Sequence, residues 1–174
     1  MPIKTVLSEY ARYRKMAEMA IEQISDAQLF SRFGGGENSV AIIVNHLSGN
    51  LLSRFTDFLT TDGEKPWRHR ETEFAPPAED RAALLARWEE AWQVVEANVG
   101  TLTAAHLEQE VSIRGKGLTV IAALHRSMAH VAYHVGQIVL MSRHYAGADW
   151  TFLSIPPGQS DAYNQNPDRE IAPR

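Results

Sequence analysis

The chain has 174 residues and a mass of 19.5 kDa, which is the size of one domain. Its composition, 44% hydrophobic and 22% charged, is typical of a globular protein, and the absence of cysteine excludes disulfides, thiolate nucleophiles and cysteine-bound metals. The net charge of −4 argues against nucleic acid as a partner, and no apolar run approaches the roughly 20 residues of a membrane span. The N-terminus also lacks the apolar stretch of a secretory signal. We therefore expect one domain over residues 1–174, in the cytoplasm, with neither nucleic acid nor membrane as partner.

In chain order, four segments have the residue preferences and the apolar spacing of helices. They cover about Val6–Ile24, Asn38–Leu59, Ala78–Val99 and Thr119–Tyr145. Ser8, Asn38-Ser39 and Thr119 are the expected N-terminal caps, and Gly147 ends the last helix. Four amphipathic helices of about 20 residues with long connections predict an all-α fold, a four-helix bundle. We expect the first two helices to be antiparallel neighbours, and the other connections leave the topology open.

Residues 61–78 form the longest of these connections and follow no period, with Asp62-Gly63 and three prolines as breaks. A loop of this length is either functional or a plain surface loop, and Trp67 within it is a candidate hydrophobic lid. Residues 111–117 predict a short extended pair around a turn. Residues 158–174 form a polar tail without periodicity.

Among the seven histidines, only His130 and His134 stand four residues apart. On a helix this spacing places both imidazoles on one face, about 6 Å apart at Cβ, where they can chelate a divalent metal. A pair at this spacing also arises by chance, so two histidines hydrogen-bonded beside the core remain an equal alternative from spacing alone. The zinc-protease motif requires Glu after the first histidine, and this chain has Val131 there.

The helical wheel places His130 and His134 at one edge of the apolar arc of their helix. His46 lies at the edge of the arc of the second helix, with Asn50 one turn further on the same side. Edge positions of two helices meet at a cleft. A third imidazole from another helix would complete a three-histidine site with open positions, as in catalytic metal sites.

Three stretches together resemble the DinB/YfiT-like superfamily, in particular one of its domain-of-unknown-function branches. They are Asn45–Leu51, Phe55–Trp67 and His130–Ile138, and the resemblance covers nearly the whole chain. It implies a four-helix bundle, usually dimeric, in which one histidine of the second helix and a His-x-x-x-His pair of the last helix bind zinc, nickel or a similar ion. That pattern falls on His46, His130 and His134.

The characterised members of this superfamily include S-transferases that use bacillithiol or mycothiol, and a maleylpyruvate isomerase. The resemblance thus implies a metal-dependent enzyme, a thiol S-transferase or hydrolase, that activates water or a low-molecular-weight thiol toward a small-molecule substrate in a homodimer. Asn50, Gln137 and Trp67 are candidates for binding a cofactor or substrate. The alternative is a non-catalytic helical dimer, a stress-response or binding module in which the metal is structural or absent.

Overall fold

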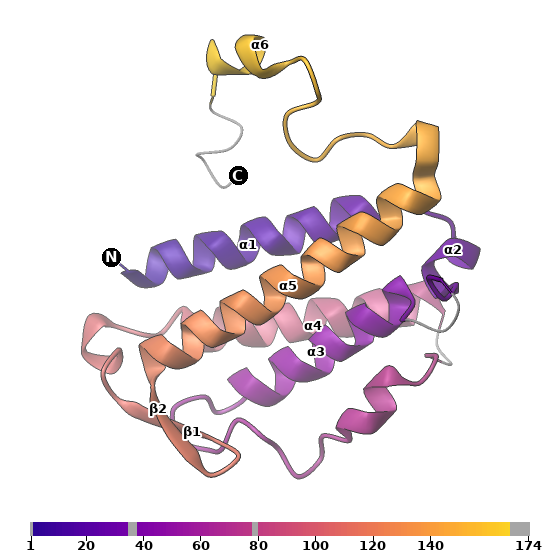
Figure 1. Ribbon diagram of the computed structural model, residues 1–174. Coiled ribbons are helices and arrows are strands. Elements are labelled where there is room, and N and C mark those ends of the chain that lie inside the picture. Colours follow the sequence, from indigo (N-terminus) through magenta and orange to yellow (C-terminus); the bar gives the residue numbers. More distant parts are fainter. Residues whose placement is uncertain (1, 35–37, 78–79, 168–174) are drawn as a thin grey trace.

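The computed structural model describes residues 2–34, 38–77 and 80–167, which form a helical bundle with one small hairpin (Figure 1). The helices are α1 (Pro2–Ile21), α2 (Asp26–Phe30), α3 (Val40–Phe55), α4 (Arg81–Val99), α5 (Val120–Ala146) and α6 (Ser160–Asn164), with short 3₁₀ helices η1 (Arg70–Phe74), η2 (Ala104–His106) and η3 (Gly147–Asp149). Strands β1 (Glu110–Ile113) and β2 (Lys116–Thr119) pair antiparallel. The predicted all-α fold is confirmed.

Side-chain caps begin three of the long helices. Ser39 accepts a hydrogen bond from Ile42 N at 3.1 Å, and Thr119 accepts one from Ala122 N at 3.3 Å, as predicted. Asp80 caps α4 in the same way. The prediction of Ser8 as a cap is wrong, because α1 already begins at Pro2, and proline suits the first turn, where its missing N–H costs nothing.

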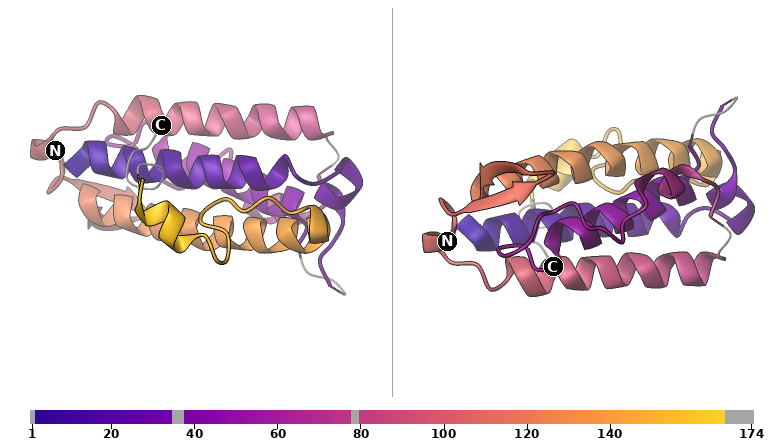
Figure 2. Two further views of the ribbon diagram at one scale, coloured as in Figure 1. Left: turned by 90° about the horizontal axis from the view of Figure 1, so that it is seen from above. Right: turned by 90° about the horizontal axis from the view of Figure 1, so that it is seen from below.

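The long helices are arranged so that α1 and α3 lie on opposite sides of the bundle. The main packing partner of α1 is α5, and that of α3 is α4 (Figure 2). The first two predicted helices, which correspond to α1 and α3, are therefore antiparallel as expected, but the expectation that they are neighbours is wrong. Figure 1 shows that α1 and α5 run in one direction and α3 and α4 in the other.

Because α3 and α4 are parallel, the chain between them must return along the length of the bundle. Residues 56–77, called the strap here, do this, and η1 within the strap packs against α3. The strap begins earlier than the periodicity predicts: α3 ends at Phe55 rather than near Leu59, and Asp57 turns the chain with a positive φ of 50°. The strap covers a face of α3 that a plain four-helix bundle would leave in solvent.

The core contains large side chains from all four long helices, including Tyr10, Phe55, Trp88 and Leu124. The Tyr10 hydroxyl donates to the Leu124 carbonyl oxygen at 3.4 Å, which satisfies a buried polar group. Nearly every residue of α3 is buried, including its polar ones, which are Asn45, His46, Ser48, Asn50 and Ser53. A helix that buries polar side chains under a strap is where a binding site is expected.

The extended pair predicted at 111–117 is confirmed as the β1–β2 hairpin, with register Val111 opposite Leu118. Its two-residue turn has positive φ at Arg114 (55°) and Gly115 (68°), as the twist of a tight hairpin requires. The polar tail contains the short helix α6, and its residues 168–174 lie outside the described part. Among the described helices, none combines the length and apolar character needed to cross a bilayer.

Candidate metal centre

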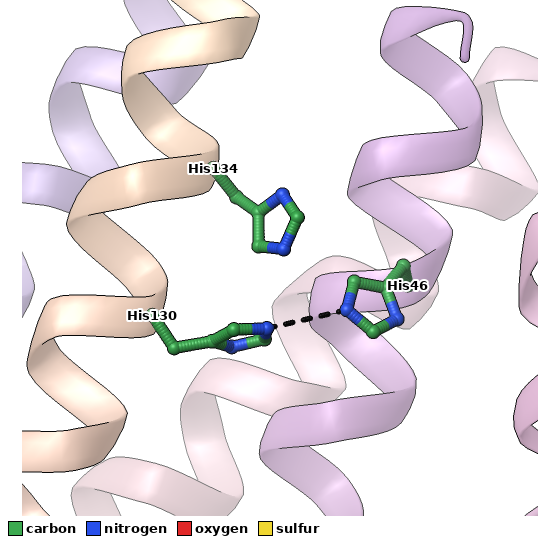
Figure 3. Close-up of side chains that lie close together, drawn as sticks. All are labelled: His46, His130 and His134. Atoms are coloured by element: carbon green, nitrogen blue, oxygen red, sulfur yellow. Dashed lines mark hydrogen bonds between the residues drawn. The ribbon is translucent and has the colours of Figure 1, made fainter. Parts of the chain in front are cut away.

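Three imidazoles from two helices meet between α3 and α5. Figure 3 shows His46 of α3 facing His130 and His134 of α5. Each offers one ring nitrogen, and these three atoms all lie within 4.8 Å of one another. The ring centroids are 5.2 Å apart for His46 and His130, 5.0 Å for His46 and His134, and 4.6 Å within the α5 pair. The three histidines therefore lie close together, as expected, while their binding of a metal stays a prediction.

Hydrogen bonds orient two of the three rings. His46 Nδ1 lies 2.8 Å from Glu73 Oε2, and because an ionised carboxylate can only accept, Nδ1 donates, which in the neutral ring leaves the lone pair on Nε2. His134 Nδ1 lies 2.8 Å from Gln137 Oε1, which accepts in the same way. The remaining nitrogens of both rings are thus acceptors that face one another. Metal-binding histidines are held in this tautomer by similar bonds.

The third ring, that of His130, cannot donate a hydrogen bond to both of these acceptor nitrogens. His130 Nε2 is 3.3 Å from His46 Nε2, while its Nδ1 is buried and has no hydrogen-bond partner in the described chain. A proton on His130 Nε2 can serve His46 but leaves the lone pair of His134 without a donor among the described residues. A cation bound by one lone pair from each of the three rings would satisfy all three histidines. Three neutral imidazoles are a common donor set for divalent metals.

The electrostatic environment keeps the α5 pair neutral. Burial, the neighbouring His134 and His46 rings and the Arg68 guanidinium lower the pKa of His130 to about 3. Burial also lowers the pKa of His134, against the opposing effect of its bond to Gln137. Both rings are therefore unprotonated near pH 7, which is the form that binds metals.

A buried ion pair supports His46 from behind. Arg68 donates to Glu73 through Nε (2.7 Å to Oε1) and Nη2 (2.9 Å to Oε2), and both side chains are almost wholly buried, at 2% and 4% exposure. Glu73 Oε2 thus serves Arg68 and His46 together. Phe74 adds a tilted ring contact to His46, with centroids 4.7 Å apart. The strap therefore sets the orientation of one of the three histidines.

The predicted cofactor-binding residues take different places. Asn50 follows His46 by one turn of α3, is buried, and makes no side-chain hydrogen bond to the described residues. Gln137 accepts a hydrogen bond from His134 Nδ1 and orients that ring. Trp67 lines a cavity together with Glu73 and Arg87 but with none of the three histidines, and it is 52% exposed. Binding of a cofactor by these three residues stays a prediction.

Sequence reasoning did not identify Glu73 or Phe74. Both lie in a segment without periodicity, and nothing in the residue order distinguishes Glu73 from its exposed neighbour Glu71. One indirect signal was present: Gly49 stands in the interior of a helix, which often marks a close approach by another segment. A Cβ at Gly49 would lie 2.3 Å from Glu73 Oε1, so this glycine makes room for the carboxylate.

No curated protein and no solved structure matches the chain. A family model described as "Protein of unknown function (DUF1572)" matches residues 2–159, which is nearly the whole chain. The chain therefore belongs to the DUF1572 family of proteins of unknown function.

Proposed function

We propose that this chain is a DinB/YfiT-like protein that binds a divalent metal through His46, His130 and His134 and acts as a metal-dependent enzyme on a small molecule. The observation that carries the proposal is the orientation of the rings: His46 and His134 each use Nδ1 in a hydrogen bond and direct Nε2 toward the other two histidines. Zinc and nickel are the ions we favour, and cobalt and copper also suit imidazole ligands.

Such an ion would act as a Lewis acid and would lower the pKa of bound water or of a bound thiol, which would supply a nucleophile near neutral pH. The chain holds the site ready for this task by keeping His130 and His134 unprotonated and His46 fixed against Glu73. Three ligands leave room for a substrate or a small thiol. Because the chain has no cysteine, any thiol must come from a cofactor such as bacillithiol, mycothiol or glutathione.

Metal analysis of protein purified without a histidine tag tests the ligand set. The unaltered protein should contain about one ion per chain, and His130→Ala/His134→Ala should contain none. His125→Ala/His144→Ala is the matched control, since it removes two exposed histidines from the same helix. A stoichiometric ion retained by His130→Ala/His134→Ala would show that the assignment is wrong.

Turnover separates the enzyme from a non-catalytic module. We expect the metal-loaded protein to transfer one of the three thiols to an electrophilic acceptor, and the His130→Ala/His134→Ala variant to lose this activity. If removal of the metal by a chelator lowers the melting temperature but neither thiol transfer nor hydrolysis is found, the metal is structural and the protein is a binding module.

The homodimer is also a proposal. Tyr133 and Leu140 are 64% and 63% exposed and lie two turns apart on the outer face of α5. Exposed apolar side chains on one helix face support an interface between two copies. Light scattering after size-exclusion chromatography should give the mass of a dimer, and Tyr133→Asp/Leu140→Asp should give the mass of a monomer.

A further inference from the structure

A second candidate site shares Glu73 with the surroundings of the metal centre but includes none of the three histidines. A cavity of about 260 Å³ opens between the strap and the helices α3 and α4. Its lining includes Asn45, Trp67, Arg68, Thr72, Glu73 and Arg87. Sites for drug-sized molecules have volumes of roughly 300–1,000 Å³, so this cavity suits a smaller ligand.

The lining carries an excess of positive charge. Arg68 and Glu73 neutralise each other through two short hydrogen bonds. Arg87 instead donates to a neutral acceptor, Asn45 Oδ1, at 3.0 Å, and in the described part of the chain no carboxylate lies within ion-pair distance of it. A partly buried guanidinium that has no counter-ion among the described residues favours an anion beside it, and its planar fork matches a carboxylate.

The lining also includes an aromatic residue, Trp67. Trp67 is 52% exposed, whereas Trp88 and Trp92 are each 1% exposed in the core. Pro76 and Pro77 add further apolar surface to the lining. An exposed indole face beside a cavity can pack against a flat apolar group, and such contacts contribute more than their area alone.

We propose that this cavity binds a small aromatic carboxylate, with Arg87 pairing with the carboxylate and Trp67 packing against the ring. The proposal does not rest on the metal centre, because none of the three histidines lines the cavity. The ligand would contact Glu73 and Arg68, the pair that supports His46. A ligand bound in this cavity could therefore change the position of His46 through Glu73.

The test is a titration of metal-free protein with benzoate and, separately, with benzamide, its neutral counterpart. Binding is measured by calorimetry and by the shift of the indole N–H signal of Trp67 in NMR spectra. Trp67→Phe identifies that signal. We expect saturable binding of benzoate at millimolar concentration, at least tenfold tighter than that of benzamide, with a shift of the Trp67 signal. Equal affinity for the two compounds, or no saturable binding of benzoate, would overturn the proposal without bearing on the metal.

A matched pair of variants tests the role of Arg87. Arg87→Gln removes the charge and should weaken benzoate binding at least tenfold while leaving that of benzamide unchanged. Arg126→Gln removes an exposed arginine of α5 outside the cavity and should have no effect. Benzoate affinity that is the same in Arg87→Gln as in the unaltered protein would assign the binding to another place and contradict the proposal.

Discussion

At the scale of single residues, Glu73 connects the strap to the three histidines. Burial alone would raise the pKa of its carboxyl group, but the hydrogen bonds from His46 and Arg68 outweigh burial and lower the pKa. The carboxylate therefore stays ionised and can only accept, which fixes the proton of His46 on Nδ1. Asn45 Nδ2 also donates to the Glu73 carbonyl oxygen, at 3.2 Å, so both backbone and side chain of Glu73 are anchored to α3.

The substitution Glu73→Gln keeps the size of this side chain and removes its charge. We expect metal affinity to fall roughly 10–100-fold, as is usual when the partner of a metal-binding histidine is altered. Competition with a chromophoric chelator measures the change. Glu71→Gln, on the exposed side of η1, is the control and should bind metal normally. Unchanged affinity in Glu73→Gln would mean that Glu73 only stabilises the fold.

For the substitution Gly49→Ala, we predict a change in the free energy of unfolding that is opposite in sign to the change expected from helix propensity. Alanine in a helix interior is normally more stable than glycine by about 0.5–1 kcal/mol. At Gly49 the added Cβ would collide with Glu73 Oε1 and Cδ, at 2.3 and 2.9 Å, and displace the carboxylate from His46 and Arg68. We therefore expect Gly49→Ala to lower both the free energy of unfolding and metal affinity.

The control for Gly49 lies in α5. A Cβ at Gly136 would meet no atom within 4 Å, so Gly136→Ala should raise the free energy of unfolding by about 0.5–1 kcal/mol. Urea unfolding monitored by circular dichroism measures both variants. If Gly49→Ala proves as stabilising as Gly136→Ala, Glu73 can move away at no cost and does not position His46.

At the scale of elements, the Asp62 carboxylate attaches the hairpin to the strap. Asp62 accepts hydrogen bonds from the backbone N–H groups of Arg114 and Gly115, each at 2.8 Å, and from the Ser112 hydroxyl at 2.6 Å. Gly63 N also donates to the Ser112 carbonyl oxygen at 2.8 Å. Since β2 leads directly into α5, this attachment joins the strap to the start of the helix that carries two of the histidines.

The hydrogen bond from Ser112, followed by the backbone bonds, holds the pKa of Asp62 well below its ordinary value. A carboxyl group whose pKa is lowered by folding adds stability above its unfolded pKa of about 3.9, and this stability is lost as the pH falls below that value. Asp62→Asn should therefore be less stable by roughly 1–2 kcal/mol at pH 7, because a charged acceptor is replaced by a neutral one.

Thermal unfolding between pH 7 and 3 tests this prediction. The difference between Asp62→Asn and the unaltered protein should narrow below about pH 4, where the carboxyl group of the unaltered protein begins to lose its advantage. Asp161→Asn, in the exposed helix α6, should follow the unaltered protein throughout. A difference that stays constant with pH would show that charge on Asp62 does not attach the hairpin.

At the scale of the whole molecule, the centre joins α3 and α5, which are far apart in the sequence, and neither histidine of α5 has a carboxylate partner among the described residues. In the unfolded chain a histidine binds a proton below about pH 6.5, whereas folded His130 does so only near pH 3. The unfolded state thus binds more protons in this range. Metal-free protein should therefore lose stability as the pH falls from about 6.5 toward 3.

His130→Gln removes one contributor to this loss. With a chelator present, the melting temperature of His130→Gln should fall less steeply between pH 6.5 and 4 than that of the unaltered protein. His125→Gln, an exposed histidine of the same helix, should leave the slope as it is. An identical slope in His130→Gln would mean that His130 gains a proton in the folded state as readily as in the unfolded one.

Much of the local structure and part of the site could be predicted from sequence. The spacing of apolar residues located the four long helices, because a helix repeats every 3.6 residues whatever it packs against. Ser39 and Thr119 were found as caps because their bonds reach only three residues along the chain. The same periodicity did not show which helices are neighbours, so the pairing of α1 with α5 was missed.

The sequence by itself determined the four long helices, the hairpin, the donor chemistry and the pairing of His130 with His134, since these follow from composition, from apolar periodicity or from residues close together in the chain. Only the tertiary structure decided that His46 meets this pair, that Glu73 and Arg68 lie behind His46, and that Trp67 opens onto a separate cavity. These contacts join segments that are distant in the sequence, so local residue spacing cannot predict them. The strap has no regular apolar spacing, and its path depends on its contacts with α3, a helix whose buried polar side chains need hydrogen-bond partners.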